Sequence, residues 1–357
     1  MTDSRPRPWI RTPLFLLVGT LLLAACGETT TPPTETTDVT VMTRNLYLGA
    51  DIFRVTQATA PEEIPAIVAE IFQIMEMNDF PARAGALAAE IEAHEPHLIG
   101  LQEVELYRIQ DPSDMSTPAT DVYLDFLEVL MDSLQVRGLQ YQVASQVVNA
   151  DVQMPAARSP TEFFDVRMTD RDVILARADV ATRNPGAQGF QAIVPFELVT
   201  GDTIWFERGY TWVDATVDGA DFTFVNTHLE VSAGGELHAI QSFQILELIQ
   251  QFGQRAQVVL VGDLNTGPGD EPYELLTGTF TDAWTALDTT DPGLTCCFPE
   301  LLNLTGDLYS RIDLILYSGT VAPLSAEVVG TDPAGRTPGG LWPSDHAGVV
   351  ANLRIQH

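Results

Sequence analysis

The chain has 357 residues, and its 18 basic residues, all of them arginine, stand against 49 aspartates and glutamates, for a net charge of −31. Because sequence-independent binding to nucleic acids and anionic membranes depends on Lys and Arg, this balance disfavours a processive DNA-binding protein. The length exceeds that of a usual domain, yet the absence of an internal repeat or a second linker favours one large domain.

The N-terminus carries the features of an export signal. Three arginines within the first eleven residues precede an apolar stretch, Pro13–Leu23, that is too short to span a bilayer comfortably. The stretch ends in Leu23-Ala24-Ala25-Cys26-Gly27, the pattern of a bacterial lipoprotein signal; the alternative is an ordinary secretory peptide with an incidental cysteine. We therefore expect a signal peptide over residues 1–25 and a lipid on Cys26.

The lipid at Cys26 would hold an exported protein to the cell envelope as its only membrane contact. Gly27 is not the aspartate that retains some lipoproteins in the inner membrane, which favours the outer membrane where a cell has one. Residues 26–38 are mostly Thr, Pro and Glu and predict a disordered tether, so the folded domain is expected over residues 39–357.

The first half of this domain predicts strands and helices in alternation. The expected elements are a strand at Val39–Thr43, helices at Pro61–Met77 and Pro81–His94, a strand at Leu98–Leu101, a loop at Asp111–Thr120 and a helix at Val122–Leu134. Proline near the start of the first two helices is typical of a first helical turn.

The second half predicts more strands. Short alternating runs from Tyr141 to Val217, with turns at glycine, indicate mainly antiparallel strands. Further strands are expected at Phe222–Val225, Val258–Val261, Ile312–Tyr317, Val321–Val329 and Val349–Ile355, with a helix at Leu237–Phe252. Helices between strands in both halves favour two sheets packed face to face with helices outside.

Polar motifs lie at the ends of several apolar runs. They are Leu101-Gln102-Glu103, Asn226-Thr227-His228, Gly262-Asp263-Leu264-Asn265 and Ser344-Asp345-His346. Strand ends hold side chains rigidly, and two histidines with several carboxylates and asparagines suit metal-assisted attack of water on a phosphate ester.

With Asn45, Arg171-Asp172 and Arg311-Ile312-Asp313 in the same order, these motifs resemble the endonuclease/exonuclease/phosphatase superfamily, which includes DNase I-like nucleases, neutral sphingomyelinases and inositol polyphosphate 5-phosphatases. The resemblance covers nearly the whole mature chain. It implies a DNase I-like four-layer α/β sandwich of two mixed, mainly antiparallel sheets. It also implies a Mg²⁺- or Mn²⁺-dependent phosphoesterase that acts by in-line attack of water.

The resemblance also assigns roles to single residues. Glu103, Asn45 and Asp345 are expected to hold the metal, since a hard cation prefers oxygen ligands. Asp263 is expected to be the general base, with Asn265 on the same side to bond the nucleophile or a phosphoryl oxygen, although Asp-x-Asn after a strand can also be a plain turn.

Two histidines are expected to contact the phosphate. His346 would be cationic, with Asp313 as the carboxylate partner that the family suggests. His228 would be the second imidazole, and the sequence identifies no carboxylate partner for it. Arg171 is a candidate phosphate contact, or else a structural arginine that pairs with Asp170 or Asp172.

The substrate is left open between classes. A phosphodiester that is small or has a neutral head group is favoured, and an extracytoplasmic DNase-like endonuclease comes next, because the charge disfavours a nucleic acid. A catalytically silent surface binding lipoprotein is the alternative of another class. Trp342-Pro343 and Phe298-Pro299 are candidate rim residues for a membrane, although Trp342 fits a packing role equally well. Cys296-Cys297 leave a vicinal disulfide open, and a monomer is expected.

Overall fold

The computed structural model describes residues 1–2, 35–231, 234–287, 289–298, 301–302 and 308–357. The expected signal peptide, the lipidation residue Cys26 and most of the tether fall outside this set. The chain divides into two units, residues 1–34 and 35–357, and the following account concerns the second. No helix of the described residues is long and apolar enough to cross a membrane.

The larger sheet contains eight strands among the described residues. They are β1 (Thr36–Asn45), β2 (Leu98–Gln102), β3 (Leu106–Gln110), β4 (Asp121–Asp125), β5 (Tyr141–Ser159), β6 (Glu162–Arg177), β15 (Val321–Val329) and β16 (Gly348–Gln356). Their order is β15-β16-β1-β2-β6-β3-β4, with β5 paired to β6. We call this sheet A; its β1–β2 pair is parallel and its other pairs are antiparallel.

The second sheet, sheet B, contains six strands of the described part of the chain. They are β7 (Ala181–Gly189), β10 (Gly209–Val217), β11 (Ala220–His228), β12 (Val258–Asp263), β13 (Thr281–Asp282) and β14 (Asp313–Ser318). The order is β13-β14-β12-β11-β10-β7, and here β11–β12 is the parallel pair. A separate hairpin joins β8 (Val194–Glu197) to β9 (Thr203–Phe206).

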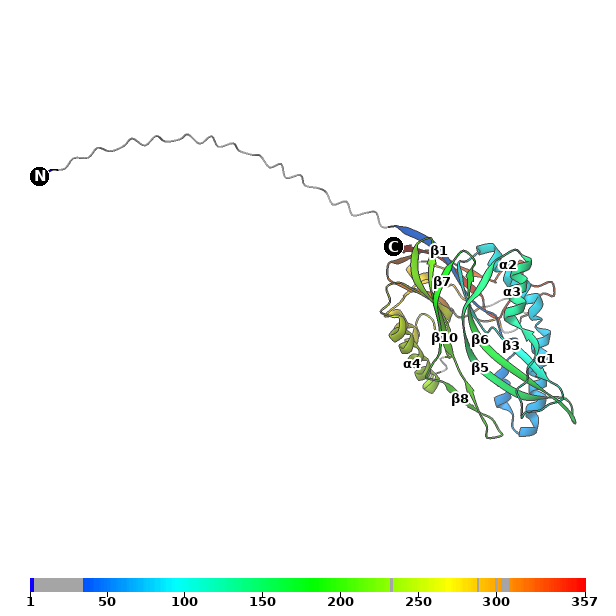
Figure 1. Cartoon of the computed structure of the whole chain (residues 1–357). Coiled ribbons are helices and arrows are strands. Elements are labelled where there is room, and N and C mark those ends of the chain that lie inside the picture. The colour runs from blue at the N-terminus through cyan, green and yellow to red at the C-terminus, as the bar shows by residue number, and fades with distance from the viewer. Residues whose placement is uncertain (3–34, 232–233, 288, 299–300, 303–307) are drawn as a thin grey trace. The chain divides into compact units, whose positions relative to one another are not determined.

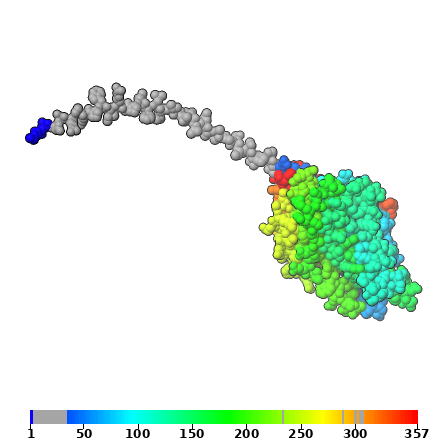
Figure 2. Space-filling view, in the orientation of Figure 1, coloured from blue at the N-terminus to red at the C-terminus, as the bar shows by residue number. Residues whose placement is uncertain are grey.

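Helices cover the outer face of each sheet. Helices α1 (Ile64–Met77), α2 (Phe80–His94) and α3 (Phe126–Val136) share one apolar cluster with sheet A, whereas α4 (Gly235–Phe252) and α5 (Glu271–Thr277) share another with sheet B. Figure 1 shows α4 on one side of the strands and α1, α2 and α3 on the other, and Figure 2 shows the corresponding yellow and cyan-to-green surfaces. Short helical turns complete the set: η1 (Ile52–Gln57), η2 (Pro61–Glu63), α6 (Ala283–Ala286) and η3 (Pro333–Gly335).

The inner faces of the two sheets form the central core. Val41 and Ile174 of sheet A pack in one cluster with Phe224 and Val261 of sheet B. The sheets approach so closely that a Cβ on Gly100 would collide with Val261, so only glycine fits there. Two sheets between two helical layers confirm the predicted four-layer sandwich.

The observed bounds differ from the predicted ones at several elements, most clearly at β1 and α3. β1 begins at Thr36, three residues before the predicted strand, because residues 36–38 pair with β16. The helix predicted from Val122 begins at Phe126, so its first four residues were assigned wrongly. Asp121–Asp125 pairs with β3 instead, and the Asp125 carboxylate then accepts from the backbone N–H of Leu127 and caps α3.

Phe298 and Trp342 are not exposed rim residues, contrary to the prediction. Each is only 2% exposed, and their rings stack with centroids 4.5 Å apart. The stacked rings bury their apolar surfaces against each other, so neither ring is available to a membrane in this conformation.

Candidate active site

The parallel strand pairs bring the polar motifs together. The carboxyl ends of parallel neighbours lie at the same edge of a sheet. Asn45 and Gln102 therefore end side by side in sheet A, as do His228 and Asp263 in sheet B. The antiparallel β14 starts at this edge, with Asp313 opposite Asp263.

A buried amide ties the two sheets together just below this edge. Asn226 of β11 donates from Nδ2 to the carbonyl oxygens of Leu101 and Val173 in sheet A, at 2.8 and 3.1 Å. Its Oδ1 accepts from Nε2 of Gln102 at 2.6 Å. All three hydrogen bonds are buried, so they fix the position of one sheet relative to the other.

The backbone is strained where the site residues leave their strands. Glu103 and Asn265 adopt positive φ values of 55° and 47°, which are uncommon for residues other than glycine. At Gly262, a Cβ would collide with the carbonyl oxygen of Thr227 in the neighbouring strand. Such conformations persist only where the surroundings hold them, and they concentrate at functional sites.

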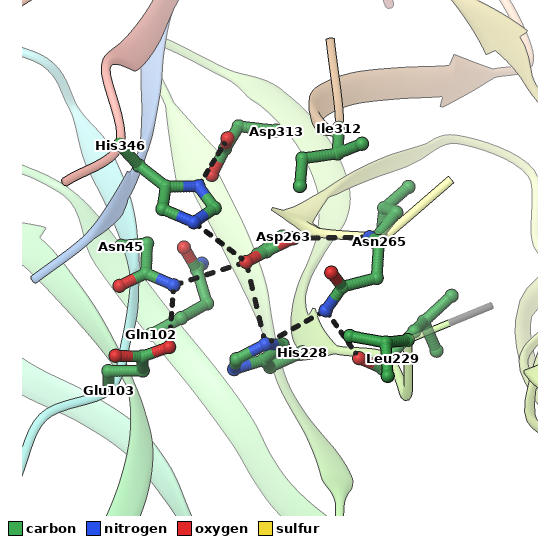
Figure 3. Close-up of polar contacts among 12 residues, drawn as sticks. Asn45, Gln102, Glu103, His228, Leu229, Asp263, Asn265, Ile312, Asp313 and His346 are labelled. Atoms are coloured by element: carbon green, nitrogen blue, oxygen red, sulfur yellow. Dashed lines mark hydrogen bonds and ion pairs between the residues drawn. The ribbon is translucent and has the colours of Figure 1, made fainter. Parts of the chain in front are cut away.

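Asp263 lies at the centre of the group (Figure 3). Its Oδ2 accepts from Nδ2 of Asn45 at 3.1 Å, and it lies 3.4 Å from Nε2 of His228 and 3.7 Å from Nε2 of His346. Its Oδ1 accepts from the backbone N–H of Asn265 at 3.1 Å. Burial raises the pKa of Asp263 to about 6, against the opposing charge of His346, which suits a general base near neutral pH.

His346 has a carboxylate partner. Nδ1 of His346 lies 2.8 Å from Oδ2 of Asp313, and both side chains are buried. Burial alone lowers the pKa of His346, but Asp313 and Asp263 outweigh it and hold that pKa well above its usual range. Arg44, paired with Glu90 of α2, donates to the carbonyl oxygen of His346 and fixes its backbone.

His228 has an arginine as its partner. NH1 of Arg208 lies 2.9 Å from Nδ1 of His228, and Nε2 of His228 lies 3.1 Å from Nδ2 of Asn265. Burial, the charge of Arg208 and the charge of His346 together hold the pKa of His228 well below its usual value. The surroundings of the two imidazoles beside Asp263 therefore act in opposite directions: they favour the charged form of His346 and the neutral form of His228.

The comparisons with known proteins agree with this geometry. The model of the Endonuclease/Exonuclease/phosphatase family matches residues 75–346, about three quarters of the chain. The chain belongs to the endonuclease/exonuclease/phosphatase family. A comparison with curated proteins returned no match.

Solved structures of this family share its fold. An endonuclease/exonuclease/phosphatase from Beutenbergia cavernae is 21% identical with a TM-score of 0.54, over 89% of this chain and 72% of that chain. A family protein from Bacteroides thetaiotaomicron is 17% identical with a TM-score of 0.56, over 90% and 96%. Truncated TDP2 from Caenorhabditis elegans is 18% identical with a TM-score of 0.51, over 90% and 98%.

The family depends on divalent metals, and the carboxylates here fit one. Ligand atoms of Asp263, Asp313 and His346 lie within 4.8 Å of one another, but the imidazole–carboxylate hydrogen bond already explains that group. Glu103 and Asp345 fit better. Both are partly exposed, and neither forms a salt bridge with any described residue. Burial and the charge of Asp345 raise the pKa of Glu103 to about 7, a repulsion that a hard cation between them would relieve.

The neighbouring loops are held in place around these carboxylates. The backbone N–H of Leu48 donates to Oε2 of Glu103 at 2.6 Å, and Nδ2 of Asn45 donates to Oε1 at 3.0 Å. The fully buried Arg83 of α2 donates to the carbonyl oxygens of Leu46 and Pro343. Leu46 follows Asn45, and Pro343 lies two residues before Asp345, so Arg83 holds the two segments that carry these site residues.

Arg171 is the predicted site residue that does not join the group. Its Nε donates to the carbonyl oxygen of Val104 at 2.8 Å, and its NH2 group bonds the carbonyl of Glu105 and the carboxylate of Asp125. These contacts brace the loop after Glu103, so the guanidinium has a structural role in this conformation.

Cys296 and Cys297 form a disulfide, the pairing that the sequence left open. Sγ of Cys297 lies 3.7 Å from Nε2 of His346, and the backbone of Cys296 pairs with Ser310 and His346. The disulfide therefore forms part of the wall of the site, between the segments that lead into β14 and β16.

Arg208, Arg83 and Asn226 support the site, yet their roles were not found from the sequence. Arg208 lies between β9 and β10 with no motif around it, and Arg83 lies in a helix with ordinary flanking residues. Asn226 is the first residue of the predicted motif Asn226-Thr227-His228, which was the one usable signal, but no role of its own was assigned to it from the sequence.

Proposed function

We propose that this family member is a metal-dependent phosphodiesterase that hydrolyses its substrate by in-line attack of water. The observation that carries the proposal is the position of Asp263. Its buried carboxylate, with a pKa of about 6, lies between a cationic and a neutral imidazole. Such a group can remove a proton from water while positive charge is held beside the phosphate.

Each residue has a part in this reaction. Asp263 accepts the proton of the attacking water, and Asn265, whose Nδ2 donates to the carbonyl oxygen of Leu229, is held beside it. His346 brings positive charge to the phosphoryl oxygens, and Asp313 keeps its imidazole charged and oriented. Mg²⁺ or Mn²⁺, held by Glu103, Asp345 and Asn45, would stabilise the charge on the departing oxygen.

We propose a small or neutral-headed phosphodiester as the substrate, with DNA less favoured. Nucleic-acid enzymes need basic surfaces, and this chain has no lysine and a net charge of −31. Arg171 and Arg311 near the site are already paired, with Asp125 and Asp282. The alternative of a silent binding protein is disfavoured because the proposed base, both imidazoles and the candidate metal ligands are all present.

We also propose that the protein is exported and lipid-anchored at Cys26. The support is the sequence Leu23-Ala24-Ala25-Cys26-Gly27 after a short apolar stretch. Metabolic labelling with a fatty acid tests it: a Cys26→Ser variant is expected to lose the label and leave the membrane fraction.

The test of the activity is a hydrolysis panel for the chain from Gly27 onward. The substrates are plasmid DNA, sphingomyelin, bis-p-nitrophenyl phosphate and p-nitrophenyl phosphate, each with Mg²⁺, Mn²⁺ or EDTA. We expect turnover of a diester that EDTA abolishes and that Asp263→Ala loses. Turnover that persists in EDTA would contradict the metal requirement, and full activity of Asp263→Ala would contradict the assignment of the base.

A further inference from the structure

Arg208 is a buried arginine whose contacts converge on His228. We propose that Arg208 is a positioning residue that fixes His228 as a neutral imidazole with its single proton on Nε2. His228 then acts on the substrate as a hydrogen-bond donor rather than as a base or a cation. The catalytic consequence rests on the proposed phosphodiesterase function, but the position of the proton does not.

The direction of the hydrogen bond follows from the chemistry of arginine. A guanidinium group has only donors and stays charged in proteins. Because NH1 of Arg208 lies 2.9 Å from Nδ1 of His228, Nδ1 must accept and therefore carries no proton. A neutral imidazole keeps one proton, and the bond at one ring nitrogen decides that it sits on the other, Nε2.

The proton on Nε2 has one acceptor among its described neighbours. Nδ2 of Asn265, 3.1 Å away, carries two N–H donors, of which the carbonyl oxygen of Leu229 accepts one at 2.9 Å, so this nitrogen competes with the Nε2 proton and cannot accept it. Oδ2 of Asp263, 3.4 Å away, can accept. The N–H of His228 thus points beside the proposed base, where an oxygen of water or of the phosphate would enter.

Arg208 is itself held in place by buried groups. Oδ2 of Asp170 in β6 lies 3.5 Å from NH1, and the guanidinium carbon lies 4.9 Å from the centre of the Phe206 ring. Burial lowers the pKa of Arg208, but the nearby carboxylates of Glu230 and Asp170 outweigh it, so the net shift is upward. The permanent charge keeps the donor present at every accessible pH.

The remaining groups that face His228 are Asp263 and Asn265 from the end of β12, and His346 from the segment before β16. The carboxylate of Asp263 by itself favours a charged ring, but burial and the charge of Arg208 oppose it, and the pKa of His228 is lowered on balance. The charge of His346 opposes a second imidazolium. The site therefore uses one cationic imidazole and one neutral donor. The buried carboxylate of Asp313 keeps His346 charged, and the buried guanidinium of Arg208 keeps His228 neutral.

The primary test is the spectrum of the wild-type full chain, purified in detergent with Mg²⁺. Long-range ¹H–¹⁵N NMR would assign both ring nitrogens of His228 by comparison with His228→Gln. We expect Nδ1 without a proton, Nε2 with one, and no titration between about pH 5 and 8. A proton on Nδ1, or titration of the ring in this range, would overturn the proposal.

Variants of Arg208 add a functional readout. Arg208→Met removes the donor, so we expect His228 to become ionisable near its usual pKa of about 6.5, with kcat/KM lower by about 100-fold and a new pH dependence. Arg208→Lys retains a charged donor and is expected to restore the neutral ring and part of the activity. A spectrum of Arg208→Met identical to that of the wild type would overturn the proposal.

Arg311→Met is the matched control. Arg311 has the same exposure as Arg208, 7%, but pairs with Asp282 and not with a histidine, so its loss is expected to leave the His228 signals in place. If the wild type hydrolysed no substrate but showed the expected spectrum, the proposed function alone would fail. Hydrolysis together with a protonated Nδ1 would reject the role of Arg208 alone, and the wild-type spectrum decides even if Arg208→Met does not fold.

Discussion

The protein keeps the carboxylate of Asp263, the proposed general base, away from water. Replacing it by asparagine preserves its size while removing its ability to accept a proton. We expect Asp263→Asn to lower kcat/KM by about 10²- to 10⁴-fold, with little change in circular dichroism. Asp214→Asn is the control, because this carboxylate of the same sheet pairs with Arg255 away from the site, and its activity is expected to remain.

The raised pKa of Asp263 also sets the direction of a pH effect. The group is protonated below about pH 6 and then cannot accept a proton from water. We expect kcat/KM to fall as the pH drops through about 6, by about tenfold per unit well below it. A steady-state pH profile would show this, and a rate independent of pH from 4 to 7 would contradict the assignment.

The Asp313–His346 pair predicts a change at the alkaline end. Because Asp313 helps to raise the pKa of His346, Asp313→Asn is expected to lower that pKa and move the alkaline fall of kcat/KM to lower pH. The pair stabilises the fold fully below the unfolded pKa of histidine, about 6.5, and this stability is lost as the pH rises through the folded pKa.

Urea unfolding as a function of pH, together with kcat/KM, measures both effects of Asp313→Asn. Asp282→Asn is the control. It removes a buried carboxylate that pairs with Arg311 and not with a histidine, so it is expected to lower stability without moving the alkaline fall. An unchanged alkaline fall in Asp313→Asn would show that His346 does not depend on this partner.

At the scale of whole elements, the position of the two sheets depends on Asn226. Removing its side chain takes one hydrogen bond each from the carbonyls of Leu101 and Val173 and from the amide of Gln102, which keeps only its bond to Thr43. At about 0.5–1.5 kcal/mol for each lost hydrogen bond, Asn226→Ala is expected to lose about 2–4 kcal/mol of unfolding free energy. Activity should fall too, because the two halves of the site are no longer fixed.

Urea unfolding of Asn226→Ala against Asn352→Ala measures this effect. Asn352 also links strands by its side chain, bonding Thr40 and Ser325, but it is partly exposed and lies within sheet A alone. Water can replace its partners, so a loss below about 1 kcal/mol is expected there. Equal losses in the two variants would mean that Asn226 does not tie the sheets.

Most of these elements were predictable because buried strands carry apolar, β-branched runs that end in polar residues. β15, at Val321–Val329, matches its predicted bounds, and the strands that carry His228 and Asp263 were found for the same reason. The error at Val122–Asp125 has a physical cause. These residues alternate too briefly to distinguish a strand from a helix, and pairing with β3 decides the outcome.

The support of the site could not be predicted in the same way. The partner of His228 comes from the connection between β9 and β10, about twenty residues earlier, where no spacing indicates a contact. Arg171 illustrates the opposite case. Its motif position suggested a phosphate contact, but the neighbouring carbonyl groups and Asp125 engage its guanidinium. Contacts of this kind depend on tertiary packing, which a local pattern does not contain.

At the scale of the whole molecule, the net charge of −31 predicts how the enzyme treats charged substrates. Raising the ionic strength from about 0.01 to 0.15 M shortens the Debye length from about 30 to 8 Å and weakens repulsion between the protein and a polyanion. Any hydrolysis of plasmid DNA is therefore expected to rise several-fold with added NaCl at constant Mg²⁺, whereas hydrolysis of bis-p-nitrophenyl phosphate changes little. A nuclease with a basic groove shows the reverse, because salt competes with its phosphate contacts. A fall of DNA hydrolysis with salt would thus reveal a local basic surface and return a nucleic acid to first place among the substrates.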